Sequence, residues 1–172
     1  MISTLNASYR IRKVRACLAR RSADQSESDS SIINSWAPEP SFPSHHSEDV
    51  KTIIPGLRIT TLAGIAPMTL MHGHMLFVEL EGGKAPEAQE VIESLQSNPR
   101  ILMCSFRNGL TSTAKLKDLF ALNGRIGDLY EVCVWNETIG VDSDGEIGMH
   151  IAIDQQADVV PENIDAIRAM FG

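Results

Sequence analysis

Two histidines separated by one glycine, His72 and His74, are the residues of this sequence best spaced to do chemistry together. They open an apolar run that continues to Leu80, which indicates a strand. Residues i and i+2 of a strand point to the same face, so both imidazoles would lie side by side. With a third ligand the pair could hold Zn²⁺. Alternatively, one ring could act as a general base, or both could be hydrogen-bonded within the sheet.

Basic and polar segments elsewhere suggest where an anion could bind. Arg20 and Arg21 end an apolar strand pattern, and a guanidinium group matches the geometry of phosphate. The Ser44-His45-His46 run leads into a predicted helix, whose first backbone N–H groups favour phosphate. The polar residues 154–158 follow the last predicted strand and could face a ligand. Each feature could equally be a solvated surface segment, so spacing alone leaves both interpretations open.

The composition is that of one soluble, cytoplasmic domain. The chain has 172 residues, of which 43% are hydrophobic and 22% charged, with a formal net charge of −7. This charge argues against a nucleic-acid or anionic-membrane surface, and no apolar run approaches the ~20 residues of a membrane span. The three cysteines, Cys17, Cys104 and Cys133, form no metal or redox motif and fit reduced thiols.

Periodicity predicts the elements that must position these residues. Strands are expected at residues 11–19, 57–66, 69–81, 100–105, 129–135 and 147–153, and helices at 86–97, 111–122 and 161–170. A short helix capped by Ser44 should run to Ile53, and the acidic, proline-rich residues 22–43 should form a surface loop. The mostly alternating strands predict an α+β fold, in which a mixed, largely antiparallel sheet carries helices on one face. No G-x-G-x-x-G is present, so no Rossmann unit is expected in this chain.

The C-terminal run Q-Q-A-D-V-V-P-E-N-I-D-A-I-R-A-M at residues 155–170 resembles the end of the catalytic domain of archaeal-type (type II) glyceraldehyde-3-phosphate dehydrogenase. Further segments resemble the same family in the same order, at residues 13–16, 20–21, 43–46, 49–52, 69–74, 109–114 and 134–135. The resemblance implies the fold expected above. It also implies oxidation of D-glyceraldehyde 3-phosphate by NAD or NADP with inorganic phosphate, through attack of a cysteine thiolate on the aldehyde.

Site residues follow from this resemblance position by position. His45 and His46 match the family's substrate-binding pair, and Arg21 is expected to assist with phosphate. Arg20 and Gln155 match residues that contact the cofactor. No metal is implied.

The resemblance assigns the catalytic histidine to His72, with His74 as the second choice. The family's nucleophile lies in a C-N-T-T motif that would precede Met1, and the three cysteines present have a different sequence context. At two positions the chain also departs from the family, because Asp154 stands where the family has histidine and Gln156 where it has glutamate.

Residues 1–172 are therefore expected to be a catalytic-domain portion cut at both ends. The NAD(P)-binding domain, the nucleophile segment and the family's last helix would be missing, and the chain alone would be inactive. The expected partners are the substrate, phosphate, an NAD(P)-binding domain in cis or in trans, and further copies in a homotetramer. Two alternatives remain, a non-catalytic phosphate-binding or assembly module and a zinc hydrolase centred on His72 and His74.

Overall fold

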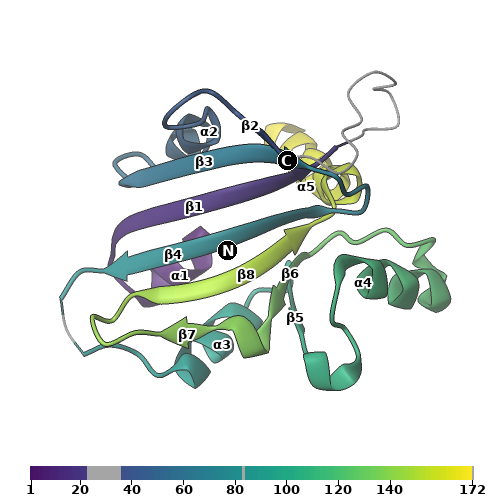
Figure 1. The fold of residues 1–172 in the computed structure, drawn as a ribbon. Coiled ribbons are helices and arrows are strands. Elements are labelled where there is room, and N and C mark those ends of the chain that lie inside the picture. The colour runs from purple at the N-terminus through teal and green to yellow at the C-terminus, as the bar shows by residue number, and fades with distance from the viewer. Residues whose placement is uncertain (23–35, 83, 172) are drawn as a thin grey trace.

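An eight-stranded sheet forms the centre of the computed structural model, which describes residues 1–22, 36–82 and 84–171 (Figure 1). The strands lie in the order β2-β3-β1-β4-β8-β6-β5, and β7 pairs with β8. β1 runs parallel to β3 and β5 parallel to β6, whereas the other pairs in the described ranges are antiparallel. The predicted α+β fold with a mixed, largely antiparallel sheet is confirmed.

The strand predictions match the observed sheet closely in position. The strands are β1 (Ile11–Arg21), β2 (Ala37–Pro38), β3 (Ile59–Ala66), β4 (His72–Leu80), β5 (Ile101–Cys104), β6 (Val132–Trp135), β7 (Gly140–Val141) and β8 (Ile147–Ile153). Only β8 has the predicted bounds, and β4 begins three residues later than predicted. The expected loop at 22–43 contains β2, which pairs with β3, while residues 23–35 of it lie outside the described part.

Five α-helices and three short helical turns accompany the sheet within the described residues. The helices are α1 (Ile2–Ser8), α2 (His46–Ile53), α3 (Ala88–Gln96), α4 (Thr113–Phe120) and α5 (Gln155–Phe171), and the turns are η1 (Phe106–Asn108), η2 (Ala121–Arg125) and η3 (Asn136–Thr138). In the described part of the chain, no helix has both the length and the apolar character needed to cross a membrane.

All four predicted helix starts differ from the structure: α3 and α4 begin two residues later than predicted, at Ala88 and Thr113, and the starts of α5 and α2 differ as follows. α5 begins at Gln155 rather than at Pro161, which lies inside the helix. The carbonyl of Asp154 accepts hydrogen bonds from the N–H groups of Ala157 and Asp158, at 2.9 Å each, and these bonds close the first turn. At α2 the N-cap is His45 rather than Ser44, because the Ser44 hydroxyl is 2.7 Å from that of Thr61 on β3.

The core consists of two clusters, and the strand residues of the two clusters point to opposite faces of the sheet. The main cluster contains Val14, Val78 and Ile147, with Val91 and Leu95 of α3 fully buried against it. The second cluster lies at the β5–β6 end of the sheet and consists of Met71, Cys104, Leu116, Leu129, Cys133, Trp135 and Ala152. Because Ala152 and Ile151 are neighbours in one strand and belong to different clusters, the two clusters lie on opposite sides of the sheet.

Part of the sheet face opposite the main cluster exposes apolar side chains. Leu62 of β3 is 51% exposed, and Met75 and Phe77 of β4 are 37% and 42% exposed. These residues alternate with buried neighbours such as Leu76 and Val78, so they lie on the other side of the strands. This face of the sheet is therefore partly apolar and exposed.

Candidate active site

The predicted site residues meet at one end of the sheet, where β1 ends, β4 begins and β8 passes into α5 (Figure 1). Strand register brings them together, because Leu18 lies opposite His74 and His72 opposite Ile153. A cavity of about 320 Å³ opens here. The predicted residues among those that line it are Arg20, Arg21, His46, His72, His74 and Gln155.

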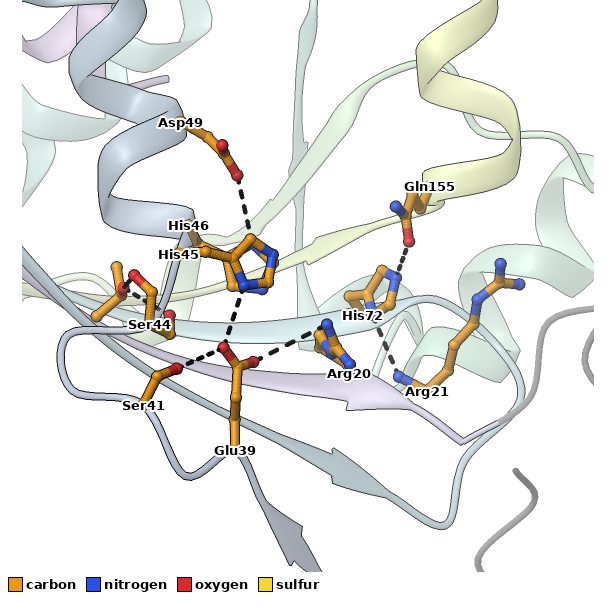
Figure 2. Close-up of polar contacts among 11 residues, drawn as sticks. Arg20, Arg21, Glu39, Ser41, Ser44, His45, His46, Asp49, His72 and Gln155 are labelled. Atoms are coloured by element: carbon orange, nitrogen blue, oxygen red, sulfur yellow. Dashed lines mark hydrogen bonds and ion pairs between the residues drawn. The ribbon is translucent and has the colours of Figure 1, made fainter. Parts of the chain in front are cut away.

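His72 lines this cavity, and both of its ring nitrogens make hydrogen bonds (Figure 2). The backbone N–H of Arg21 donates to His72 Nδ1 at 3.1 Å. An N–H can only donate, so Nδ1 carries the lone pair and the ring proton is on Nε2. Nε2 accordingly donates to Oε1 of Gln155. The ring is only 8% exposed, and this burial, reinforced by the nearby Arg21 and Arg20 charges, lowers the pKa of His72 below its usual value.

The backbone before His72 explains why β4 starts later than predicted. Met71 has a φ of 65°, the left-handed region that non-glycine residues rarely adopt. Its side chain is 1% exposed and packs in the second core cluster. Packing therefore holds a strained residue directly beside the histidine, and such residues tend to occur at functional sites.

His74 lies beside His72 on the same strand face, as the i and i+2 spacing predicts. The two ring centroids are 6.2 Å apart. Burial lowers the pKa of His74 to about 4, and the neighbouring His72 and His46 act in the same direction. Near neutral pH, His74 therefore lines the cavity as an uncharged imidazole. The only group of metal-ligand type within the described ranges lies elsewhere, so the zinc interpretation of the His72–His74 pair lacks a third ligand there.

Gln155 reaches His72 because a buried ion pair fixes the start of α5. Nζ of Lys117, on α4, is 2.6 Å from Oδ2 of Asp154. The same carboxylate oxygen accepts a hydrogen bond from the N–H of Leu129 at 3.3 Å. Asp154 is 3% exposed and directly precedes Gln155, so this pair ties the helix start to the sheet end.

The two histidines at the start of α2 take different positions (Figure 2). Their ring centroids are 4.0 Å apart, and the ring planes are tilted by 38° to each other. His46 lines the cavity, whereas His45 is exposed and its Nδ1 lies 3.1 Å from Oε1 of Glu39. Oε2 of Glu39 is 4.0 Å from Arg20. Burial lowers the pKa of His46, and the charges of His45 and Arg20 add to this effect.

Glu39 and Asp154 are the polar residues of this region that the sequence interpretation missed in these roles. Glu39 stands between two prolines in a segment without periodicity, and only its hydrogen bond to β3 aligns it, since its N–H donates to the carbonyl of Ala63 at 2.9 Å. Asp154 was recognised as polar, but its partner Lys117 is 37 residues away. No local pattern signals either contact.

The cavity can bind a small anionic ligand beside a neutral hydrogen-bond donor. Its two arginines supply positive charge, and His72 offers a proton at Nε2. A volume of about 320 Å³ is at the small end of ligand pockets, which run from about 300 to 1,000 Å³. Of the residues described, no cysteine lines this cavity.

Comparison with known proteins identifies the family. The model of the family described as glyceraldehyde 3-phosphate dehydrogenase, C-terminal domain, matches residues 1–123. A glyceraldehyde-3-phosphate dehydrogenase of Archaeoglobus fulgidus is 44% identical over 173 residues, which cover 99% of this chain and 50% of that protein. The homologous enzymes of Methanobrevibacter smithii and Halobacterium salinarum are 44% and 41% identical. The chain thus spans about half the length of the curated relatives it matches.

A solved structure agrees on the fold. The aspartate semialdehyde dehydrogenase II of Vibrio cholerae, complexed with ASA, aligns with a TM-score of 0.68 at 11% identity. The alignment covers 98% of this chain and 56% of the other. At that identity the likeness concerns architecture alone, whereas the sequence matches confirm the predicted family. The chain belongs to the glyceraldehyde 3-phosphate dehydrogenase C-terminal domain family.

Proposed function

We propose that this chain is the catalytic-domain part of a cytoplasmic, phosphorylating glyceraldehyde-3-phosphate dehydrogenase. The observation that carries the proposal is the convergence of Arg20, Arg21, His46, His72 and Gln155 on one cavity. The substrate would be D-glyceraldehyde 3-phosphate, with inorganic phosphate as the second reactant. NAD⁺ or NADP⁺, when bound, supplies the hydride acceptor.

His72 is proposed to act on the oxygen of the reacting aldehyde. Attack of a cysteine thiolate on the carbonyl carbon moves one electron pair onto this oxygen, and the resulting negative charge needs a fixed donor. The Nε2–H of neutral His72 is such a donor once Gln155 releases it. To act as a general base at Nε2, His72 would need its proton on Nδ1. That nitrogen instead accepts a hydrogen bond from the Arg21 N–H. The hydrogen bonds therefore support a donor role over the general-base role that the spacing of the two histidines also allowed.

The remaining residues are proposed to bind and orient. Arg21 and His46 would bind the phosphate groups, with His45 contributing from beside the cavity. Gln155 and Arg20 would hold the nicotinamide end of the cofactor, since the exposed Gln155 amide can pair with a carboxamide. Polypeptide outside residues 1–172, in cis or in trans, would bind the rest of the cofactor and supply the nucleophilic cysteine.

Assembly is proposed to use the exposed sheet face. Leu62, Met75 and Phe77 form an apolar surface there, and such surfaces commonly mark protein interfaces. A homotetramer built through this face would cover it.

A chimeric enzyme tests the proposal. Residues 1–172 would replace the matching half of the Archaeoglobus fulgidus relative, and NAD(P)H formation from the aldehyde and phosphate would be measured. We expect the chimera to be active and the 172-residue chain alone to be inactive. Within the chimera, His72→Ala should lower kcat by about 10²–10³, the cost of removing one oxyanion donor.

The matched variants separate the possible roles. His72→Gln keeps an N–H donor and should retain more activity than His72→Ala if His72 donates, but equally little if it is a base. His150→Gln, at an exposed position on β8, serves as the control. A folded chimera without activity that still binds phosphate would instead favour the alternative, a non-catalytic phosphate-binding module.

A further inference from the structure

A cluster of three ligand-type side chains lies beside the cavity, at the junction between β2 and α2. One ligand atom from each of Glu39, His45 and His46 lies within 4.8 Å of the others. We propose that these residues bind a divalent transition metal ion such as Zn²⁺. The site is separate from the His72–His74 pair.

The geometry of the cluster is already close to that of a metal site. Nδ1 of His45 and Oε1 of Glu39 are 3.1 Å apart, whereas two ligands of a tetrahedral Zn²⁺ at about 2.1 Å would be roughly 3.4 Å apart. In the metal-free protein a proton joins these two atoms. A metal ion would replace this proton, as binding to imidazole and carboxylate generally does.

Two polar atoms of the cluster have no hydrogen bond within the described part of the chain. Nε2 of His46 and Oε2 of Glu39 are buried and lack a hydrogen-bond partner there. Buried polar atoms are normally satisfied, so such atoms call for an explanation. A metal ion held by His45, His46 and the Glu39 carboxylate would give both atoms a partner if it bound Nε2 of His46 and both carboxylate oxygens.

The surroundings hold the ligands in place. The N–H groups of Glu39 and Ser44 donate to the carbonyls of Ala63 and Thr61, at 2.9 and 3.0 Å, so both ligand segments are anchored to β3. Asp49 lies 4.0 Å from Nδ1 of His46, on the side where a carboxylate commonly orients a metal-binding imidazole.

The charges nearby are mixed. The carboxylates of Glu39 and Asp49 favour a cation, and Arg20, 4.0 Å from Oε2 of Glu39, opposes it. Oxygen-preferring Mg²⁺ and Ca²⁺ do not suit two imidazoles, whereas Zn²⁺, Co²⁺ and Ni²⁺ do. Three protein ligands leave a coordination position for water or another small ligand. Because His46 also lines the cavity, the metal site would adjoin it.

Calorimetric titration of the metal-free 172-residue chain with Zn²⁺ tests the proposal. We expect one ion per chain, and a visible Co²⁺ spectrum without thiolate charge transfer. Glu39→Gln and His46→Gln should each weaken Zn²⁺ binding at least about 100-fold, because loss of a group that merely orients a ligand already costs about 10–100-fold. His45→Gln alters an exposed side chain, so it tests the same site without risk to the fold.

The controls address the other candidate ligands. His74→Gln and His150→Gln should leave the affinity within about twofold, and unfolding of each variant is followed by circular dichroism. The proposal is overturned if the wild-type chain binds no Zn²⁺ at micromolar concentrations. It is also overturned if binding survives in both Glu39→Gln and His45→Gln, or if the Co²⁺ spectrum shows cysteine ligation. None of these measurements depends on dehydrogenase activity.

Discussion

Replacing Lys117 by methionine should destabilise the fold by about 2–4 kcal/mol, because it leaves a buried carboxylate without its cation. The Asp154 side chain is 4% exposed, and Lys117 Nζ lies 2.6 Å from it. Removing one partner of a buried ion pair costs about 3–5 kcal/mol. Lys117 is 23% exposed and Asp154 keeps its hydrogen bond from Leu129, so we place the expected cost below the upper end of this range.

Lys115→Met is the matched control on the same helix. Nζ of Lys115 lies 3.9 Å from Asp118, and the two side chains are 61% and 69% exposed. Exposed pairs contribute about 0–1 kcal/mol, so this variant should unfold almost like the wild type. Urea unfolding followed by circular dichroism gives both free energies. In thermal unfolding, the Lys117 variant should lose roughly 2–4 °C for each kcal/mol.

A second substitution separates loss of the ion pair from loss of the lysine's packing. Lys117→Met combined with Asp154→Asn removes both charges and keeps the size of the buried side chain, so it should recover part of the lost stability. Because Asp154 fixes the start of α5, the single variant should also change the NMR signals of the His72 ring, which Gln155 contacts. If Lys117→Met costs no more than Lys115→Met, the ion pair does not fix the helix start and the reasoning fails.

Two further predictions concern ionisation. His74→Gln should make the free energy of unfolding depend less on pH on the acid side. The pKa of His74 in the folded chain is about 4, below the usual 6.5, so between these two values the unfolded chain binds more protons. The wild type therefore loses up to about 3 kcal/mol of stability as the pH falls from 6.5 to about 4. Equilibrium unfolding at several pH values measures the slope, and an unchanged slope would contradict it. Asp158→Asn should stabilise the chain by up to about 3 kcal/mol near neutral pH, because burial and then Glu162 and Asp154 raise the pKa of Asp158 to about 6 from 3.8. Between pH 3.8 and about 6 the folded Asp158 carboxyl holds its proton and the unfolded one does not. The stability gained by Asp158→Asn should therefore vanish as the pH falls below this interval, and a gain that persists in acid would have another cause.

The sheet half of the site could be predicted because strand alternation is a property of neighbouring residues. The run from His72 to Leu80 puts both histidines on one face, and their rings are indeed 6.2 Å apart. The strand ending in Arg20-Arg21 and the strand 147–153 followed from the same signal. The left-handed Met71 that delays β4 could not be predicted, since it depends on packing in the second core cluster.

The helical half of the site was harder because local rules gave a plausible wrong answer. Proline favours the first turn of a helix, which suggested a start at Pro161, yet α5 begins six residues earlier. Proline at this position removes the N–H that would bond the carbonyl of Ala157, so the longer helix costs one hydrogen bond. The Lys117–Asp154 pair and the bonds to the Asp154 carbonyl offset this loss. The ion pair joins residues 37 apart, so no local pattern signals it, and it ties the start of α5 to the end of the sheet, where Gln155 reaches His72.

Glu39 shows the same dependence on distant partners. Its segment has no periodicity, and it reaches His45 because β2 pairs with β3 and α2 is bound to the same strand through Ser44. A sequence search for metal ligands favours close spacings such as His72-Gly-His74, which has no third ligand in the described residues. A third ligand, the Glu39 carboxylate, lies beside the His45-His46 pair instead, and it comes from a separate segment. Two segments anchored to one strand therefore create a possible metal site that the spacing of the histidines does not reveal.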